Sequence, residues 1–486
     1  MAENDLKQKA TSGIIWSSIQ RFAGMGISFI SGIVLARLLT PEDYGCIGML
    51  SIFMVVASSF VDGGFASALI QKKRPTQEDY STIFFFNLGM SLLMYAILFI
   101  AAPAIARFYK MPLLSSVLRV QGLVLIIQAF SLIQSNQLRK QFKFRKIAII
   151  TLTASITSLV ITIVMAYKGF GVWALVTMNL ITAVIPAIVY WLTGKWRPLL
   201  VFSKNSFKEL FSFGFFMFLS NLINTFCNNI QGLLIGRFYN PATMGYYSKA
   251  KSTEELASTS ISNVMGQVTY PLYSEYQNDK AKLANVIKRI TSTVAYITFP
   301  LMFLLILLAK PVFMLLYSER WMDSVPYFQL FCIAGIAICL QSINGQAIAA
   351  IGKSKVMFRW TLVKRGTGLI LLVLGMAVYG IYGLIAASVI TSWLIYLINA
   401  WLVNKHIGYG FGEQIKDLLP ILVISLIAFA VSYCSGIVST NIFLSGGVKL
   451  VVFSLIYAVL SVAFKLEALS YAKELFPMII RKFKTI

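Results

Sequence analysis

Ionisable and hydroxyl side chains cluster at the start of one apolar stretch of this sequence. Lys249, Lys251, Glu254 and Glu255 are followed one turn later by Ser258. A charged side chain at the centre of a bilayer costs roughly 2.5–3.5 kcal/mol, so it usually faces the interior of a helix bundle. We therefore predict that this cluster meets water or substrate. Lys249, Lys251 and Ser258 are its predicted substrate ligands, and Glu254 and Glu255 its predicted ion- or proton-coupling groups.

The spacing of the charged residues is compatible with two positions of this cluster, in a cavity or at an exposed helix end. On a helix, Lys251, Glu255 and Ser258 fall on one stripe, because side chains four and seven positions apart share a face. Such a stripe could line a cavity. The alternative is an exposed helix end that a Lys251–Glu255 pair neutralises.

Two arginines are candidate ligands for an anion. Arg21 lies roughly 13 Å along the axis of the first apolar helix, at 1.5 Å per residue, where its side chain reaches the bilayer surface only under strain. The guanidinium fork matches phosphate oxygens, so we predict an anion contact. Arg365, beside Lys364 and two turns inside a later apolar stretch, could bind the same group. For Lys364 and Arg365, the alternative is contact with lipid headgroups.

Several amide side chains and one aspartate lie inside stretches that are otherwise mostly apolar. Asn224 and Asn228 take the places that Gly24 and Ser28 occupy 200 residues earlier. We predict that these two amides, together with Asn229 and Gln231, line an aqueous cavity; the alternative is hydrogen bonding between packed helices. Asp62, the carboxylate inside the second apolar stretch, is a predicted proton carrier or, alternatively, a helix-end residue.

The elements that position these residues are transmembrane helices. The 486 residues are 58% hydrophobic and only 12% charged, whereas soluble domains are about 25% charged. Apolar stretches long enough to cross a ~30 Å hydrocarbon core recur throughout. We predict an all-α integral membrane protein of about fourteen spans, at residues 12–36, 44–68, 80–103, 113–134, 147–167, 170–192, 209–236, 244–270, 285–309, 325–350, 357–379, 383–403, 417–436 and 446–465. The first is too long for a signal peptide, so we expect it to remain in the mature protein.

The basic residues predict the orientation of these spans. Most of them fall at alternate span ends, in clusters at 72–74, 139–146, 195–208, 280–289, 353–365 and 481–484. Since Lys and Arg are retained on the cytoplasmic side, both termini are predicted to be cytoplasmic. The net charge of +24 is thus explained by topology, and nucleic-acid binding is not expected because no basic soluble domain is present.

Metal and cofactor chemistry is not indicated. The five cysteines lie in or beside apolar stretches without CxxC pairs, and the single histidine, His406, stands at a helix end. No cluster of His, Cys and carboxylates has the spacing of metal ligands. We expect no metal, no cofactor and no catalytic residue.

The chain contains an internal repeat. Gly32, Arg37, Pro41 and Gly45 recur as Gly232, Arg237, Pro241 and Gly245, in the same order and spacing. We predict a six-helix lobe at 1–200, a second at 201–408, and two appended helices with a basic tail at 409–486. Six spans separate the copies, so the repeat is parallel, as in transporters whose halves rock about a substrate path. The alternative is that the repeat records ancestry alone, but no loop is long enough for other chemistry.

Short motifs in a fixed order then suggest a family. They are residues 13–17 (Gly-Ile-Ile-Trp-Ser), 36–45 (Ala-Arg-Leu-Leu-Thr-Pro-Glu-Asp-Tyr-Gly) and 62–71 (Asp-Gly-Gly-Phe-Ala-Ser-Ala-Leu-Ile-Gln), with others at 213–214, 235–237, 245–248, 271–277 and 350–353. The chain resembles the polysaccharide transporters of the multidrug/oligosaccharidyl-lipid/polysaccharide flippase superfamily, particularly the Wzx-type colanic acid and teichuronic acid exporters. Relatives often carry an acidic residue near Gln231, where this chain has an amide.

The resemblance implies a fold and a function. It implies two six-helix lobes of the MATE type plus two helices, which move an undecaprenyl-diphosphate-linked oligosaccharide to the outer leaflet of the bacterial plasma membrane. The product would be exopolysaccharide, capsule or O-antigen. Membrane lipid, a polymerase and a chain-length regulator are the implied partners, and no enzymatic activity is expected. Alternatives are a multidrug/cation antiporter, a lipid II flippase, or a membrane glycan polymerase or ligase; the last of these usually needs a large outer loop.

Overall fold

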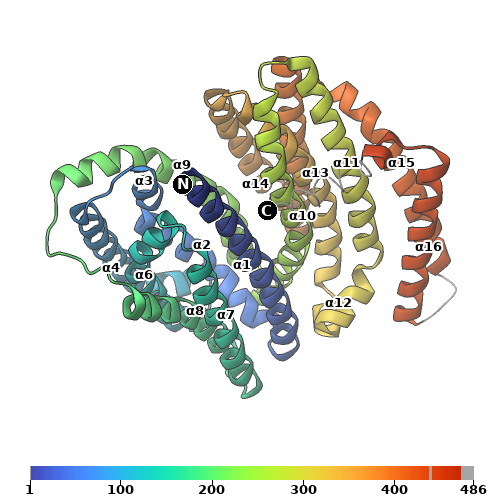
Figure 1. Ribbon diagram of the computed structural model, residues 1–486. Helices are drawn as coiled ribbons and strands as arrows, with labels where there is room; N and C mark the ends of the chain where they lie inside the picture. Colours follow the sequence, from blue (N-terminus) through green and yellow to red (C-terminus); the bar gives the residue numbers. More distant parts are fainter. Residues whose placement is uncertain (1, 437–440, 472–486) are drawn as a thin grey trace. The chain divides into compact units, whose positions relative to one another are not determined.

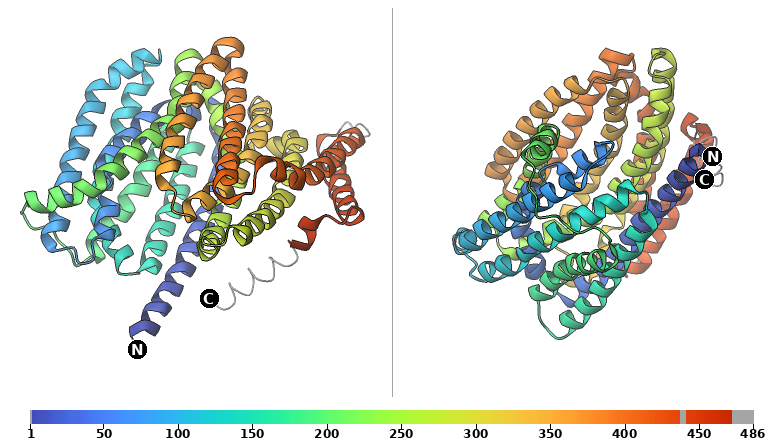
Figure 2. Two further views of the ribbon diagram at one scale, coloured as in Figure 1. Left: turned by 90° about the horizontal axis from the view of Figure 1, so that it is seen from above. Right: turned by 60° about the vertical axis from the view of Figure 1, so that its left-hand side comes forward.

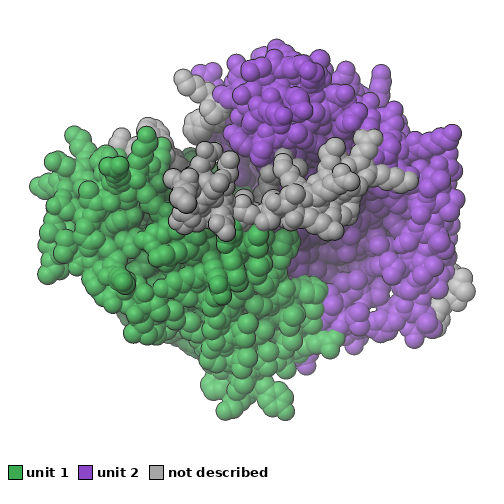
Figure 3. All heavy atoms as spheres, in the orientation of Figure 1, with its two compact units in different colours: residues 1–245 green, residues 246–486 purple. Residues whose placement is uncertain are grey.

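The computed structural model describes residues 2–436 and 441–471 and divides into two compact units. Unit 1 comprises residues 1–245 and unit 2 residues 246–486, and Figure 3 colours them separately. Every regular element in the described residues is helical, which confirms the all-α prediction. The basic cluster at 481–484, at the end of the predicted 409–486 segment, lies outside the described residues.

Unit 1 contains nine complete helices among its described residues and the first turn of a tenth (Figure 1). They are α1 (Ala2–Leu38), α2 (Pro41–Asp62), α3 (Phe65–Gln71), α4 (Gln77–Phe108), α5 (Leu113–Gln121), α6 (Leu123–Lys140), α7 (Phe144–Tyr167), α8 (Val172–Thr193), α9 (Lys204–Phe238) and the start of α10 (Pro241–Glu275). Helix α1 packs on α7, α2 on α9, and α6 lies between α4 and α8. Figure 2 shows the same bundle from two further sides.

Unit 2 continues α10 and adds the remaining helices. They are α11 (Lys280–Leu307), α12 (Ala309–Tyr317), the short 3₁₀ helix η1 (Glu319–Trp321), α13 (Ser324–Ala350), α14 (Ser354–Ile407), α15 (Phe411–Ser435) and α16 (Ile442–Ala463). Helix α13 packs on α14 and α11, and α15 packs on α11 and α16. Helix α9 packs on α2 and α3, so it belongs to unit 1. The boundary between the units follows it, at Gly245 in the first turns of α10.

Eleven helical segments in the described residues are long and apolar enough to cross a membrane. One of them, residues 359–407, would be about 70 Å long at 1.5 Å per residue, more than twice the hydrocarbon core. Tyr379 and Gly380 leave helical geometry in its middle, so α14 is two successive helices, as the predicted spans 357–379 and 383–403 require. Helices α9 and α10, which hold the predicted asparagines and the Lys–Glu cluster, are not among the eleven.

The second predicted span is broken. Helix α2 begins with a capping box in which Thr40 accepts the backbone N–H of Asp43, and Pro41 occupies the first helical position. It ends where Gly63 and Gly64 adopt φ values of 53° and 75°, a left-handed region that favours glycine. The predicted 44–68 helix is thus α2 followed by the separate helix α3.

Helix α3 is fixed by packing and by one cationic side chain at its end. Phe65 and Leu69 are buried in a core with Ile83, Phe84 and Ile133. The Nζ of Lys140 donates to the backbone carbonyls of Leu69 and Lys72, which lie at the end of α3.

Beyond α3, the loop residue Lys72 forms ion pairs with Asp79 and Glu209 at 3.1 Å and 2.8 Å. Burial by itself lowers the pKa of Lys72, but hydrogen bonds to Glu209 and Asp79 outweigh it and hold the pKa above its usual value. The ammonium therefore stays charged at neutral pH and joins α3 to α4 and α9.

Candidate functional site

A polar cavity lies inside unit 1, between α2 and α9. Its volume is about 430 Å³, within the usual range of small-ligand sites. It is lined by Val55, Ser58, Ser59, Asp62, Gly64, Phe218, Asn221, Asn224, Thr225 and Asn228, which we call the polar pocket. The structure thus brings together Asp62, Asn224 and Asn228, which the sequence predicted on separate grounds.

Helical spacing explains why these side chains converge. The lining residues of α2 are at 55, 58, 59 and 62, and those of α9 are at 221, 224, 225 and 228. Each set follows the i, i+3, i+4, i+7 pattern of one helix face, and the two faces meet because α2 packs on α9. Asn221, Ser58 and Ser59 were missed by the sequence prediction, although Asn221 continues the Asn224–Asn228 stripe by one turn.

Asp62 lies both at the end of α2 and in the lining of the polar pocket. Its carboxylate accepts hydrogen bonds from the backbone N–H groups of Gly64 and Ala66, so it ends α2 as the alternative interpretation proposed. It also lines the polar pocket beside the asparagines. Phe60 and Phe218 pack edge to face at 5.1 Å between the same two helices. The pocket therefore offers amide, hydroxyl and carboxylate groups at a fixed helix junction.

Asn229 is a neighbour of the pocket with different contacts. Its Nδ2 donates to the backbone carbonyl of Thr225, one turn earlier in the same helix, at 2.8 Å. It is absent from the lining although it adjoins Asn228. Two adjacent amides of α9 thus have different surroundings.

The charged cluster of α10 is divided between two environments in unit 2. Glu255 is half exposed and pairs with Lys251 at 3.9 Å, as the alternative interpretation proposed. Glu254 and Ser258 are buried, with 2% and 1% of their surfaces exposed. The residues predicted to form one stripe therefore meet solvent at Glu255 and the protein interior at Ser258.

Glu254 fits against a glycine of α13. A Cβ atom at Gly335 would overlap the Oε1 atom of Glu254, so the missing side chain makes room for the carboxyl group. The Ser258 hydroxyl interacts with this carboxyl group, so two buried polar side chains of α10 face each other in the interior of unit 2.

Lys249 is enclosed by aromatic rings. Its Nζ lies 4.2 Å from the ring centre of Tyr317 and 5.5 Å from that of Trp321, and the residue is 5% exposed. Cation–π attraction of this kind compensates part of the lost hydration. Thr253 fixes the Tyr317 hydroxyl at 3.0 Å.

The two predicted arginine ligands lie apart from the polar pocket. Arg21 is exposed on α1 and does not line the pocket. Arg365 is half-buried on α14, next to Lys364, whose Nζ donates to Asn399 Oδ1. Within the described residues, no group of His, Cys, Asp and Glu could hold a metal ion.

These observations define a multi-pass helical membrane protein with a polar pocket between two of its helices. Residues 34–326 match the family described as "Polysaccharide biosynthesis protein", which covers more than half of the chain. The chain therefore belongs to this family, and the predicted resemblance is confirmed.

Curated relatives and a solved structure extend this result. The chain is 25% identical to the teichuronic acid biosynthesis protein TuaB of Bacillus subtilis (strain 168), over 88% of this chain and 90% of TuaB. It is 23% identical to the succinoglycan biosynthesis transport protein ExoT of Rhizobium meliloti (strain 1021), over 73% of this chain and 72% of ExoT. Its fold is similar to that of the lipid II flippase MurJ in an inward closed conformation, with a TM-score of 0.76, 17% identity, and coverage of 93% of this chain and 98% of MurJ.

Proposed function

We propose that this protein is a flippase for an undecaprenyl-diphosphate-linked oligosaccharide in the bacterial plasma membrane. It would move the lipid-linked oligosaccharide from the cytoplasmic to the outer leaflet by alternating access, for exopolysaccharide, capsule or O-antigen synthesis. The polar pocket carries the proposal, because it places a carboxylate, three asparagines and several hydroxyls between helices of a membrane protein. The name of ExoT, a transport protein, and that of TuaB, a teichuronic acid biosynthesis protein, support it.

The chemistry of the pocket suits sugars. A sugar entering a membrane protein loses water around its hydroxyl groups, which costs several kcal/mol unless new hydrogen bonds replace it. Asn221, Asn224 and Asn228 each offer donors and an acceptor, and Asp62 adds acceptor oxygens. We assign Asn224 and Asn228 to the sugar hydroxyls, with Asn221 as an added contact.

The diphosphate needs cations. We assign Arg21 in unit 1, and Lys251 and Arg365 in unit 2, to it as separate candidate contacts, since guanidinium and ammonium groups lower the electrostatic cost of burying phosphate. Lys249 is stacked on Tyr317, so we assign it a charge-balancing role near that group. Ser258, predicted as a sugar contact, is now proposed to hold the buried carboxyl of Glu254, with which its hydroxyl interacts.

Transport also requires groups that couple it to an ion gradient, and partner molecules. Asp62 and Glu254 are the proposed coupling groups, whereas Glu255 forms an exposed pair with Lys251. Membrane lipid is the medium, and a polymerase and a chain-length regulator are the proposed protein partners. Both termini are proposed to be cytoplasmic. No bond is made or broken, so no catalytic residue is assigned.

A cation antiporter is the second candidate. The observation in its favour is Asp62, a carboxylate that lines a pocket and could bind a cationic drug. A lipid II flippase would differ only in cargo. A polymerase or ligase would be an enzyme, and nothing specific in the described structure favours it.

The test uses two adjacent amide positions. Cells that lack their own flippase are given wild-type protein, N224A/N228A or N229A, at matched protein levels. Loss of two hydrogen bonds, each worth about 1 kcal/mol, should reduce glycan export about tenfold or more in N224A/N228A and raise lipid-linked oligosaccharide in the inner leaflet. N229A should export normally, because Asn229 does not line the polar pocket.

The same cells distinguish a glycan flippase from a cation antiporter. Normal export by N224A/N228A would remove the pocket assignment. Dye resistance that depends on Asp62, without a glycan phenotype in the null strain, would replace the flippase proposal with the antiporter.

A further inference from the structure

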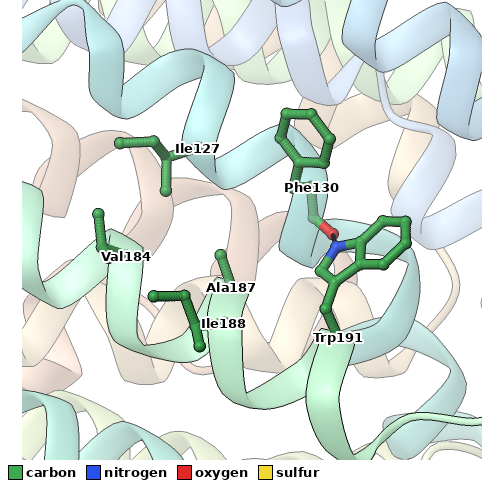
Figure 4. Close-up of a pocket in the computed structure, with 6 residues that line it drawn as sticks. All are labelled: Ile127, Phe130, Val184, Ala187, Ile188 and Trp191. Atoms are coloured by element: carbon green, nitrogen blue, oxygen red, sulfur yellow. Dashed lines mark hydrogen bonds between the residues drawn. The ribbon is translucent and has the colours of Figure 1, made fainter.

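Two grooves flank the end of α8 in unit 1. The apolar groove, between α6 and α8, has a volume of about 390 Å³ and is lined by Ile127, Phe130, Val184, Ala187, Ile188 and Trp191 (Figure 4). The basic groove, between α7 and α8, has a volume of about 500 Å³ and is lined by Lys143, Arg145, Lys146, Ile149, Ile150, Val189 and Thr193. The two grooves share a helix and differ in charge.

The lining of the basic groove combines cationic side chains, which we call its rim, with apolar side chains, which we call its floor. Its three charged lining residues are all basic, and none of its lining residues is acidic. Ile149, Ile150 and Val189 form the floor, on two helices that are long and apolar enough to cross a membrane. A ligand that fits both parts carries an anionic group joined to a hydrocarbon chain.

Specific contacts position the rim. The Nζ of Lys146 donates to the carbonyl of Thr193 at 3.2 Å, which joins α7 to the end of α8. The Arg145 guanidinium lies over the Trp16 ring at 5.4 Å. Lys143 precedes α7, whose first turn has no side-chain cap, so the positive end of the helix dipole adds to the cations.

The position of the groove along the helices matches a lipid. Lys143 precedes the start of α7 and Thr193 ends α8, so the cations stand where two apolar spans reach the headgroup region. Basic pockets between transmembrane helices at this level bind anionic headgroups. Free phosphate would leave the isoleucine and valine floor without a partner.

We propose that the basic groove binds an anionic phospholipid, with its phosphate at Lys143 and Arg145 and an acyl chain along Ile149, Ile150 and Val189. This site does not depend on the proposed flippase function. The apolar groove supplies an internal comparison. It has no cationic lining residue, and the nearby Arg197 is bonded to the carbonyls of Trp191 and Gly194. The apolar groove should accept an acyl chain of any lipid.

The test measures binding of phosphatidylglycerol and phosphatidylcholine with identical chains to the delipidated full-length protein by native mass spectrometry. Wild-type protein should bind phosphatidylglycerol more tightly. K143Q/R145Q should weaken that binding about tenfold or more, since each basic residue near a lipid surface contributes about a factor of five. Phosphatidylcholine binding should not change. K204Q/K208Q, which removes two exposed charges of α9 outside the groove, should behave as wild type.

A second variant tests the floor. V189W fills the groove while leaving the rim intact, and it should also reduce phosphatidylglycerol binding. Equal losses in K143Q/R145Q and K204Q/K208Q would show non-specific surface attraction and overturn the site. So would unchanged binding in both K143Q/R145Q and V189W.

Discussion

At the scale of single residues, Glu254 differs most from its neighbour Glu255. Lys251 and Glu255 face its carboxyl from its own helix, Cys332 and Cys339 face it from α13, and it is 2% exposed. Enclosing a carboxylate costs several kcal/mol unless it is well paired. Lys251 is engaged with Glu255 at 3.9 Å, so the arrangement favours a neutral carboxyl that can take up and release a proton.

The matched pair E254Q and E255Q tests this role. Gln reproduces the shape of a neutral carboxyl without the exchangeable proton, so E254Q should reach normal levels and make glycan export insensitive to the proton gradient. E255Q loses only an exposed ion pair, worth at most about 1 kcal/mol, and should keep the wild-type response. Export would be measured in inverted vesicles with an imposed pH gradient. A wild-type response in E254Q would end the coupling assignment.

The sequence predicted the polar residues better than it predicted their surroundings. Asn224, Asn228 and Asn229 could be selected because amides are unusual in an apolar helix, but of these three the polar pocket is lined by Asn224 and Asn228 and not by Asn229. Glu254 and Glu255 could not be distinguished, since adjacent residues differ by about 100° around a helix and only packing sets which one is enclosed. Gly335, which makes room for Glu254, lies 81 positions away in the sequence and gave no signal.

At the scale of elements, the repeat produces a reciprocal contact within unit 1. A Cβ atom at Gly45 would overlap the Pro241 carbonyl oxygen, and one at Gly245 would overlap the Pro41 carbonyl oxygen. Gly45 corresponds to Gly245, and Pro41 to Pro241, 200 positions later in the sequence. The glycine of each copy contacts the proline of the other copy, which is the reciprocal pattern that a local two-fold axis requires. The first turns of α2 and α10 therefore cross at glycines because no side chain fits between the backbones.

Gly45→Ala should accordingly destabilise the folded protein. The added methyl group meets backbone atoms, which cannot move aside as a side chain can, and overpacking of this kind costs about 1–3 kcal/mol. The melting temperature of the purified protein in detergent would fall. The control is Gly89→Ala in α4, where a Cβ atom meets nothing within 4 Å and alanine favours the helix. Equal melting temperatures for the two variants would contradict the close crossing.

Helix breaks were the elements that the sequence predicted least well. The apolar pattern of residues 44–68 continues across Gly63–Gly64, so the region was predicted as one helix, whereas residues 113–134 lie in one candidate span, Leu113–Lys140, as predicted. Hydropathy measures affinity for lipid and does not register a change of backbone direction. The break at Gly63–Gly64 nevertheless sets the polar pocket, since Asp62 and Gly64 both line it.

At the scale of the whole molecule, composition and short motifs were sufficient for the class and the family. Repeated apolar stretches required helices, because each backbone polar group in lipid must be satisfied within its own segment. The division at 1–200, 201–408 and 409–486 remains a prediction. In the described residues, α15 is joined to α13 and α14 by the buried Gln414, which bonds to Asn344 at 3.0 Å and to Tyr396 at 2.9 Å. The first appended helix is thus fastened to unit 2 by polar contacts that hydropathy does not reveal.

The direction of insertion is the remaining property of the whole chain that the basic residues predict. Lys73 is exposed in the loop after α3, and Lys168 is exposed after α7. Three predicted spans separate them, an odd number, so they should lie on opposite faces of the membrane. In protein whose five cysteines are replaced, a membrane-impermeant maleimide applied to intact cells should label Lys168→Cys, and should label Lys73→Cys only after permeabilisation. The reverse pattern would place both termini outside the cell. That result would contradict the orientation predicted from the excess of Lys and Arg on the membrane face that contains Lys73. Labelling of both positions in intact cells would contradict the predicted spans between them.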